Sequence, residues 1–176
     1  MTSDLGARAT STDVDDEIVF DPHNCFACGS LNTNGLRLDL HFGGERCWTE
    51  LAIPGRFQGW DEIAHGGIVA TLLDEVMAWS LVDTDNWGLT ARLTVEFKRP
   101  VPLDRPIRAE GWITEGRRRL IRTAGRLLEP ASGELFATAK GTYVAASDAR
   151  KQELKQRYGY RRIARDEAVR LAEARR

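Results

Sequence analysis

The sequence predicts a single domain of the α+β class, in which an antiparallel β-sheet wraps around one buried helix. The first observation is the apolar segment at residues 66–82, where hydrophobic side chains cover almost the whole circumference of a helix. The second is a series of segments around it that alternate apolar and polar residues, as half-buried strands do. The third is the length of 176 residues, enough for one sizeable core. In a chain of this size, a sheet wrapped around such a helix buries it on all sides.

The strands are predicted from this alternation and from the turns between them. Gly43-Gly44 marks a hairpin between the first two strands, and prolines end the third. Hairpin connections of this kind make the sheet antiparallel. In chain order, we expect strands at residues 36–42, 46–53, 89–100, 107–115, 119–128 and 135–145.

Both ends of the chain differ in composition from the domain between them, residues 19–147. Residues 1–18 are polar and acidic, so we expect a disordered arm. Residues 148–176 are densely charged and have only a thin apolar stripe. Ser147 can cap a helix there, with a break near Gly159. We expect this segment to be a helical appendage on the surface.

The segment His65-Gly66-Gly67, with Asp74 nine residues after the histidine, carries the strongest functional signal. The glycines leave backbone N–H groups accessible at the predicted start of the helix. A helix N-terminus attracts negative charge, including the charge that develops on an attacked carbonyl oxygen. Asp74 lies further along the same helix among apolar residues, where a carboxylate is unusual. The pattern predicts an oxyanion site and a reactive carboxylate on one helix.

The spacing also predicts a dimer. At about 1.5 Å per residue, Asp74 lies roughly 13 Å along the helix from His65, too far for both to contact one carbonyl group. If both ends serve one site, two copies of the helix must run antiparallel about a two-fold axis. We therefore expect a homodimer, which could pair further into a dimer of dimers.

The pattern His-Gly-Gly, six residues and Asp, followed by the segment at residues 90–102, resembles the PaaI-type acyl-CoA thioesterases of the hotdog superfamily. The resemblance covers about residues 25–146. It implies a hotdog fold and the hydrolysis of an acyl-CoA thioester to a free acid and coenzyme A, without a cofactor. One departure is Gly59, because many members carry an asparagine six residues before the histidine; the adjacent Gln58 could replace it.

The resemblance also implies roles for single residues. Asp74 would be the general base or the nucleophile, and the Gly66 N–H would donate to the thioester oxygen. Thr90 would hold the attacking water, and His65 would shape the oxyanion side. Three of them also have a structural interpretation: Asp74 as a solvent-facing carboxylate, Thr90 as an ordinary strand residue and His65 as a structural histidine. Glu75 is the weaker candidate base because it points to another side of the helix.

Candidate substrate-binding residues are of two kinds. Cations at a strand end and around a hairpin, including Arg117, Arg118, Arg119 and Arg122, could bind the phosphates of coenzyme A, although a hairpin tip is usually just solvated. Aromatic and apolar residues, including Phe57, Trp79 and Trp87, could line an acyl pocket, although most such residues belong to the core. The predicted substrate-binding residues are Gln58, Trp60, Gly67, Met77, Lys98 and Arg99.

The cysteines do not predict a metal site by themselves. Cys25 and Cys28, with His23 before them, have the spacing of a zinc half-site, but no second Cys-x-x-Cys follows. His41 and Cys47 could complete a site only if the fold brought them close. We expect a turn packed on the core, with no metal, and an odd count of three cysteines argues against a disulfide framework.

Composition excludes several classes of function. A net charge of −1 offers no general attraction to nucleic acid or to an anionic membrane, and the N-terminus does not look like a secretory signal. We therefore expect a cytoplasmic enzyme that acts on acyl-CoA. One alternative is a non-catalytic acyl-CoA sensor on the same scaffold. Another is a hotdog hydratase, but the local motif of that class is absent.

Overall fold

The computed structural model describes residues 16–43, 45–164, 166–167 and 170 of the protein. Its helices are α1 (Gly66–Trp79) and α2 (Asp148–Tyr158), with 3-10 turns at Gly55–Phe57 and Val82–Thr84. Its strands are β1 (Asp16–Val19), β2 (His41–Gly43), β3 (Arg46–Ala52), β4 (Gln58–Trp60), β5 (Ile63–Ala64), β6 (Gly88–Phe97), β7 (Pro106–Arg117), β8 (Leu120–Leu128), β9 (Leu135–Ala145) and β10 (Arg161–Ala164).

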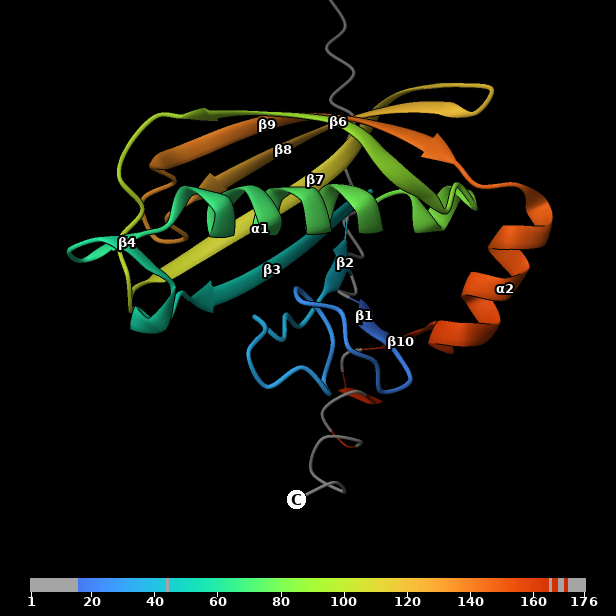
Figure 1. The fold of residues 1–176 in the computed structure, drawn as a ribbon, viewed down its shortest axis with the longest axis horizontal. Coiled ribbons are helices and arrows are strands. Elements are labelled where there is room, and N and C mark those ends of the chain that lie inside the picture. Colours follow the sequence, from blue (N-terminus) through green and yellow to red (C-terminus); the bar gives the residue numbers. More distant parts are fainter. Residues whose placement is uncertain (1–15, 44, 165, 168–169, 171–176) are drawn as a thin grey trace, which may run out of the picture.

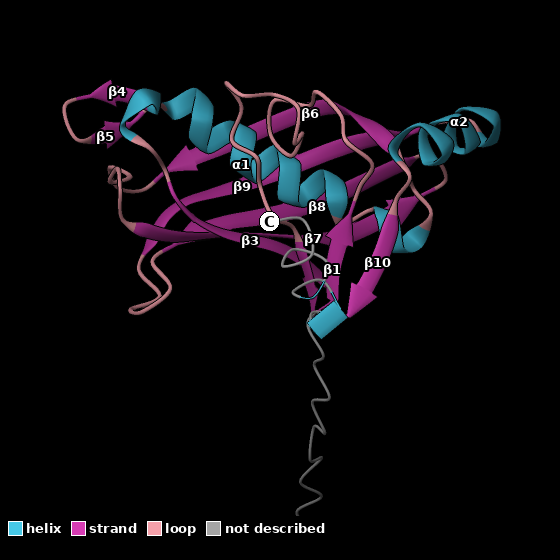
Figure 2. Cartoon of the chain, turned by 90° about the horizontal axis from the view of Figure 1, so that it is seen from below, coloured by secondary structure: helices cyan, strands magenta, loops and turns pink. Residues whose placement is uncertain are grey.

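The described strands form one large antiparallel sheet and one small hairpin. The large sheet has eight strands in the order β10-β1-β2-β3-β7-β8-β9-β6, and β4 pairs separately with β5. Helix α1 lies across one face of the large sheet, against β3, β7, β8, β9 and β6 (Figure 1, Figure 2). The predicted α+β fold, an antiparallel sheet around a central helix, is confirmed.

The core lies between α1 and the sheet. The helix buries one face there, comprising Val69, Leu72, Leu73, Val76 and Met77. Opposite it, the strands alternate as expected: in β8, for example, Ile121, Thr123 and Leu127 point inward and are buried. Among the described residues, no helix is long and apolar enough to cross a membrane.

The first predicted strand is shorter than expected. Only β2 pairs in the sheet, while the preceding residues 36–40 bind the cysteine loop instead. Leu36 N–H donates to the Phe26 carbonyl at 2.8 Å, and Leu38 N–H donates to Ala27 at 2.9 Å. Leu38 is nevertheless buried, so the alternation of apolar residues reports burial here rather than strand pairing.

The two ends of the chain meet at one edge of the sheet. The last residues of the predicted N-terminal arm form β1, which pairs with β10 and β2; residues 1–15 lie outside the described part. The predicted C-terminal helix ends at Tyr158, because Gly159 adopts a left-handed conformation with φ of 54°. The chain then returns as β10, so this segment contributes a strand to the sheet rather than a helix alone.

Candidate functional site

The Asp74 carboxylate lies in the middle of α1 and faces β6 and β9. The Thr90 hydroxyl lies 2.9 Å from Asp74 Oδ1 and 3.2 Å from Oδ2. The Tyr143 hydroxyl lies 2.8 Å from Oδ1 and 3.1 Å from the Asp74 carbonyl oxygen. Thr90 and Tyr143 are direct cross-strand partners, so one step of the β6–β9 ladder holds the carboxylate. Two hydroxyl donors on one half-buried carboxylate fix its orientation.

Tyr143 was not among the residues predicted from the sequence. Its ring is completely buried, and burial, followed by the charge of Asp74, raises the pKa of its hydroxyl. It therefore stays protonated and donates to the carboxylate near neutral pH. Gly141 makes room for the ring, because a Cβ there would lie 2.6 Å from Tyr143 Cε2. The only sequence signal is the position of Tyr143 on an alternating strand, which becomes informative once its pairing with Thr90 is known.

The glycine motif forms the start of α1. His65 is the N-cap, and its Nδ1 accepts a hydrogen bond from the Gly67 N–H at 3.0 Å. Gly66 is the first helical residue, so its N–H has no acceptor within the helix. Gly66 also lines an apolar groove of about 340 Å³ that includes Val69 and Phe97. The Gly66 N–H is thus the donor that this end of the helix can offer to a ligand oxygen.

Gln58 does not replace the asparagine that many members of the resembled family carry six residues before the histidine, because its side chain does not contact His65 in the hydrogen bonds described. Its side chain lies 3.4 Å from Asp61 Oδ1 and 3.4 Å from the Glu62 N–H, within the β4–β5 hairpin. At Gly59, a Cβ would lie 2.9 Å from His65 Cα, so an asparagine does not fit there without a shift of the backbone. The histidine is positioned by its own cap interaction instead.

The remaining predicted substrate-binding residues occupy three different settings. Lys98 and Arg99 line the same groove as Gly66, and they pair with Glu96 at 2.5 Å and Glu134 at 3.0 Å. Trp60 is 82% exposed at the end of β4. Met77 is 0% exposed, so it is a core residue and has no surface to offer a ligand in this chain.

The predicted hairpin arginines and aromatic residues are dispersed. Arg119 donates to the Ala145 carbonyl, and Arg122 pairs with Glu115 at 2.8 Å, so the hairpin charges are partly neutralised. Trp79 and Trp87 do share a cavity, of about 220 Å³, but it opens beside the cysteine loop and is lined by Glu75, not by Asp74. Phe57 packs instead against the edge of Phe26.

That cavity also contains Cys25, Cys28 and Glu75. The Trp79 indole N–H donates to Glu75 Oε1 at 2.9 Å. Burial, followed by the Cys25 charge, raises the pKa of Glu75 to about 7. A hydrogen bond between the two thiols lowers the pKa of Cys25 to about 5 and raises that of Cys28. Cys47 and His41, by contrast, lie on β3 and β2 and do not join the other cysteines.

Comparison with known proteins gives one family and one fold. Residues 62–146 match the model of the thioesterase superfamily. None of the curated proteins compared with this chain matches it in sequence. The solved structure of a thioesterase superfamily protein, RHA08564, is similar with 26% identity and a TM-score of 0.63; the match covers 69% of this chain and 60% of that one.

Two further structures share the fold at lower identity. Zebra fish thioesterase superfamily member 2 is similar with 15% identity and a TM-score of 0.61, over 68% of this chain and 90% of that one. A hypothetical thioesterase protein from Streptococcus pneumoniae TIGR4, solved with coenzyme A, has 16% identity and a TM-score of 0.55, over 58% of this chain and 82% of that one.

Proposed function

Because residues 62–146 match the thioesterase superfamily and the chain has the hotdog fold, we propose that it is a thioesterase that hydrolyses an acyl-CoA thioester to a free acid and coenzyme A. The observation that carries this proposal is the Asp74 carboxylate, oriented by the hydroxyls of Thr90 and Tyr143. A carboxylate fixed in this way can take a proton from water as the water attacks the thioester carbonyl carbon, or attack that carbon itself. The C–S bond then breaks, and the coenzyme A thiolate takes up a proton as it leaves. On the second route this step leaves an acyl–Asp74 anhydride, which water then hydrolyses to the free acid and the Asp74 carboxylate.

The negative charge that develops on the carbonyl oxygen needs a hydrogen-bond donor to stabilise it. The Gly66 N–H is suited to this role because it starts the helix and lines an open apolar groove. Lys98 and Arg99 flank the same groove, where they can exchange their carboxylate partners for phosphates of coenzyme A. The coenzyme A in the S. pneumoniae structure supports this class of ligand.

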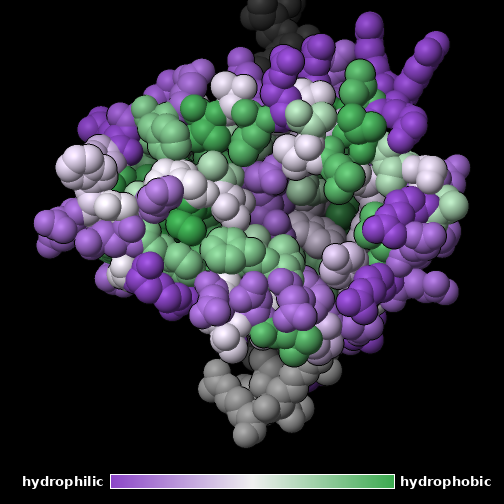
Figure 3. Space-filling model, in the orientation of Figure 1, coloured by the Kyte–Doolittle hydropathy of each residue, from purple (hydrophilic) through white to green (hydrophobic). Residues whose placement is uncertain are grey.

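A second copy of the chain would bring the Gly66 N–H of one subunit close to Asp74 of the other. Strand β6 offers a surface on which the two copies can pair. The outer edge of β6 has no strand partner among the described residues, and its ends carry Leu89 and Phe97, which are 78% and 56% exposed. Hydrophobic residues gather over α1 and β6 on the face shown in Figure 3. An edge of this kind favours pairing with another copy of itself.

The direction of that pairing follows from the neighbours of β6. Thr90, near its start, contacts Asp74, and Phe97, at its end, lies beside Gly66. When two β6 strands pair antiparallel about a two-fold axis, the start of one lies opposite the end of the other. Asp74 of one subunit then faces the Gly66 N–H of its partner, which is the arrangement that the spacing on α1 requires.

The test is a thiol-release assay over short, medium, long and aromatic acyl-CoA substrates, with wild type, Asp74→Asn and the control Asp39→Asn. Asp39 is an exposed carboxylate on the loop before β2. We expect Asp74→Asn to fold and to lose on the order of 10²–10⁴-fold in kcat, while the control retains its activity. Acyl-CoA binding without any thiol release by wild type would identify a sensor instead and would refute the hydrolase proposal.

A further inference from the structure

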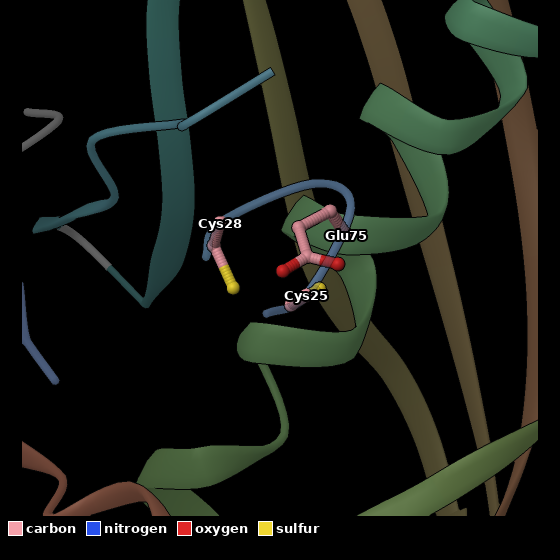
Figure 4. Close-up of side chains that lie close together, drawn as sticks. All are labelled: Cys25, Cys28 and Glu75. Atoms are coloured by element: carbon pink, nitrogen blue, oxygen red, sulfur yellow. The ribbon is translucent and has the colours of Figure 1, made fainter. Parts of the chain in front are cut away.

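Cys25, Cys28 and Glu75 form a compact cluster between the cysteine loop and α1. Their sulfur and carboxylate oxygen atoms all lie within 4.8 Å of one another. Figure 4 shows the two thiols on one loop and the Glu75 carboxylate reaching toward them from the helix. The loop turns tightly at this point, because the Gly29 N–H donates to the Cys25 carbonyl at 3.0 Å.

The loop conformation depends on a glycine. A Cβ at Gly29 would lie 2.4 Å from Cys25 N and 2.5 Å from Cys25 O, so no other residue fits there without a shift of the backbone. His23 supports the same turn, because its Nδ1 accepts the Cys25 N–H at 3.3 Å. The turn therefore presents both thiols to the helix in a defined arrangement.

The cluster concentrates groups that can carry negative charge in a small space. Two thiols and one carboxylate meet in a largely buried position, where an uncompensated charge is costly. The Trp79 indole supplies one hydrogen bond to Glu75. None of the ion pairs among the described residues involves Glu75.

We propose that Cys25, Cys28 and Glu75 bind a zinc ion. In a tetrahedral site, Zn–S bonds of about 2.3 Å and Zn–O bonds of about 2.1 Å place the ligand atoms roughly 3.5–3.8 Å apart, which the present cluster reaches with small side-chain shifts. Two sulfur ligands at Cys-x-x-Cys spacing favour zinc over calcium or magnesium. Both cysteines bind zinc as thiolates, and a thiol proton displaced on binding passes to solvent. This proposal replaces the expectation of no metal drawn from the sequence.

The fourth ligand is a water molecule from the adjoining cavity of about 220 Å³. His23 lines the same cavity, but its Nδ1 already accepts the Cys25 N–H. In this arrangement the His23 Nδ1 positions Cys25 and is not available to the ion. The zinc ion would connect the loop before β2 to the centre of the helix that carries Asp74, and so stabilise the fold.

The experiment uses the full-length chain, reduced, stripped with a chelator and returned to zinc in competition with a chromophoric chelator. We expect one zinc ion per chain and a rise in Tm on adding zinc. Glu75→Gln keeps an acceptor for Trp79 but removes the anionic ligand, so zinc affinity falls by more than about 100-fold. Cys25→Ser and Cys28→Ser lose binding in the same way. Replacing zinc with cobalt(II) gives a thiolate-to-metal charge-transfer band that is lost in both serine variants.

The matched control is Cys47→Ala, which removes the buried third cysteine and leaves the cluster intact. It should bind zinc as wild type does. If the reduced wild type binds zinc no more tightly than Glu75→Gln, the proposal is overturned, even if the serine variants do not fold. A Cys25–Cys28 disulfide in mild oxidant, without zinc uptake by the reduced chain, also overturns it and identifies a redox pair. Thioesterase activity tests a different site, so its absence leaves the zinc result unaffected.

Discussion

Thr90 and Tyr143 face each other across β6 and β9, and the hydroxyls of both reach the same Asp74 carboxylate. One residue is exposed and the other is completely buried. The buried hydroxyl fixes one oxygen from the inside, while the exposed hydroxyl lies where water can enter. We therefore predict that Tyr143 positions the carboxylate and that Thr90 lies on the side from which water approaches.

Tyr143→Phe keeps the buried ring and removes its hydroxyl. A hydrogen bond to a charged group contributes about 1.5–3 kcal/mol, so we expect kcat to fall about 10–100-fold with KM little changed. Steady-state kinetics with the best acyl-CoA substrate, together with circular dichroism, measures this. Thr90→Ser, which retains a hydroxyl, should lose far less activity than Thr90→Ala. Wild-type kcat in Tyr143→Phe would show that the tyrosine has only a packing role.

Gly141→Ala should disturb the same site by displacing the Tyr143 ring. The new Cβ would lie 2.5 Å from Thr123 Oγ1 and 2.6 Å from the Tyr143 ring, so the ring must move away from Asp74. Overpacking of this kind costs about 1–3 kcal/mol. We expect a lower free energy of unfolding, measured in urea, and a lower kcat in the fraction that stays folded.

Gly116→Ala is the matched control for this experiment. It makes the same substitution in a neighbouring part of the sheet, where a Cβ meets nothing within 4 Å. Equal losses of stability and activity in the two variants would contradict the steric explanation.

The strands and the helix start that could be predicted are those marked by local features of the sequence. The predicted strand at residues 135–145 matches β9, since alternation and the flanking turns are visible within a few residues. The start of α1 is equally local, because His65 caps a helix that begins at the next residue, Gly66. His65, Gly66 and Asp74 could therefore be placed on one helix from the sequence.

Contacts between distant segments could not be predicted in this way. Tyr143 is 69 residues from Asp74, and the pairing of β1 with β10 joins the two ends of the chain. The approach of Glu75 to the cysteine loop is of the same kind. Each depends on strand register or on loop docking, which the pattern of apolar residues does not specify.

Gly66→Pro tests the oxyanion donor at the start of α1. Proline is favoured at the first position of a helix, and His65 has φ of −60° and ψ of 134°, which suits a residue before proline. The substitution therefore removes the N–H while the helix is retained. We expect kcat to fall about 10²–10³-fold, as when one oxyanion donor is lost.

Gly66→Ala is the control, because it keeps the N–H and places a Cβ 3.4 Å from the Phe97 ring, an ordinary contact. It should retain most of the activity. If both variants lose activity equally, the effect comes from the side chain and not from the missing donor. Retention of full kcat by a folded Gly66→Pro variant would remove Gly66 from the proposed mechanism.

Mixed dimers test whether Asp74 and Gly66 act across subunits. Asp74→Asn and Gly66→Pro chains, each nearly inactive alone, are unfolded together and refolded as an equal mixture. Because half of the dimers are then mixed, and each mixed dimer has one intact pair out of two, activity should return to about a quarter of the wild-type level per chain. If both groups serve a site within one chain, no mixing restores activity, since every site then contains one altered residue. If the two variants carry different tags, purification by both tags in sequence isolates the mixed dimer. This dimer should have half of the active sites of the wild-type dimer. An inactive mixed dimer would contradict the two-fold arrangement proposed from β6.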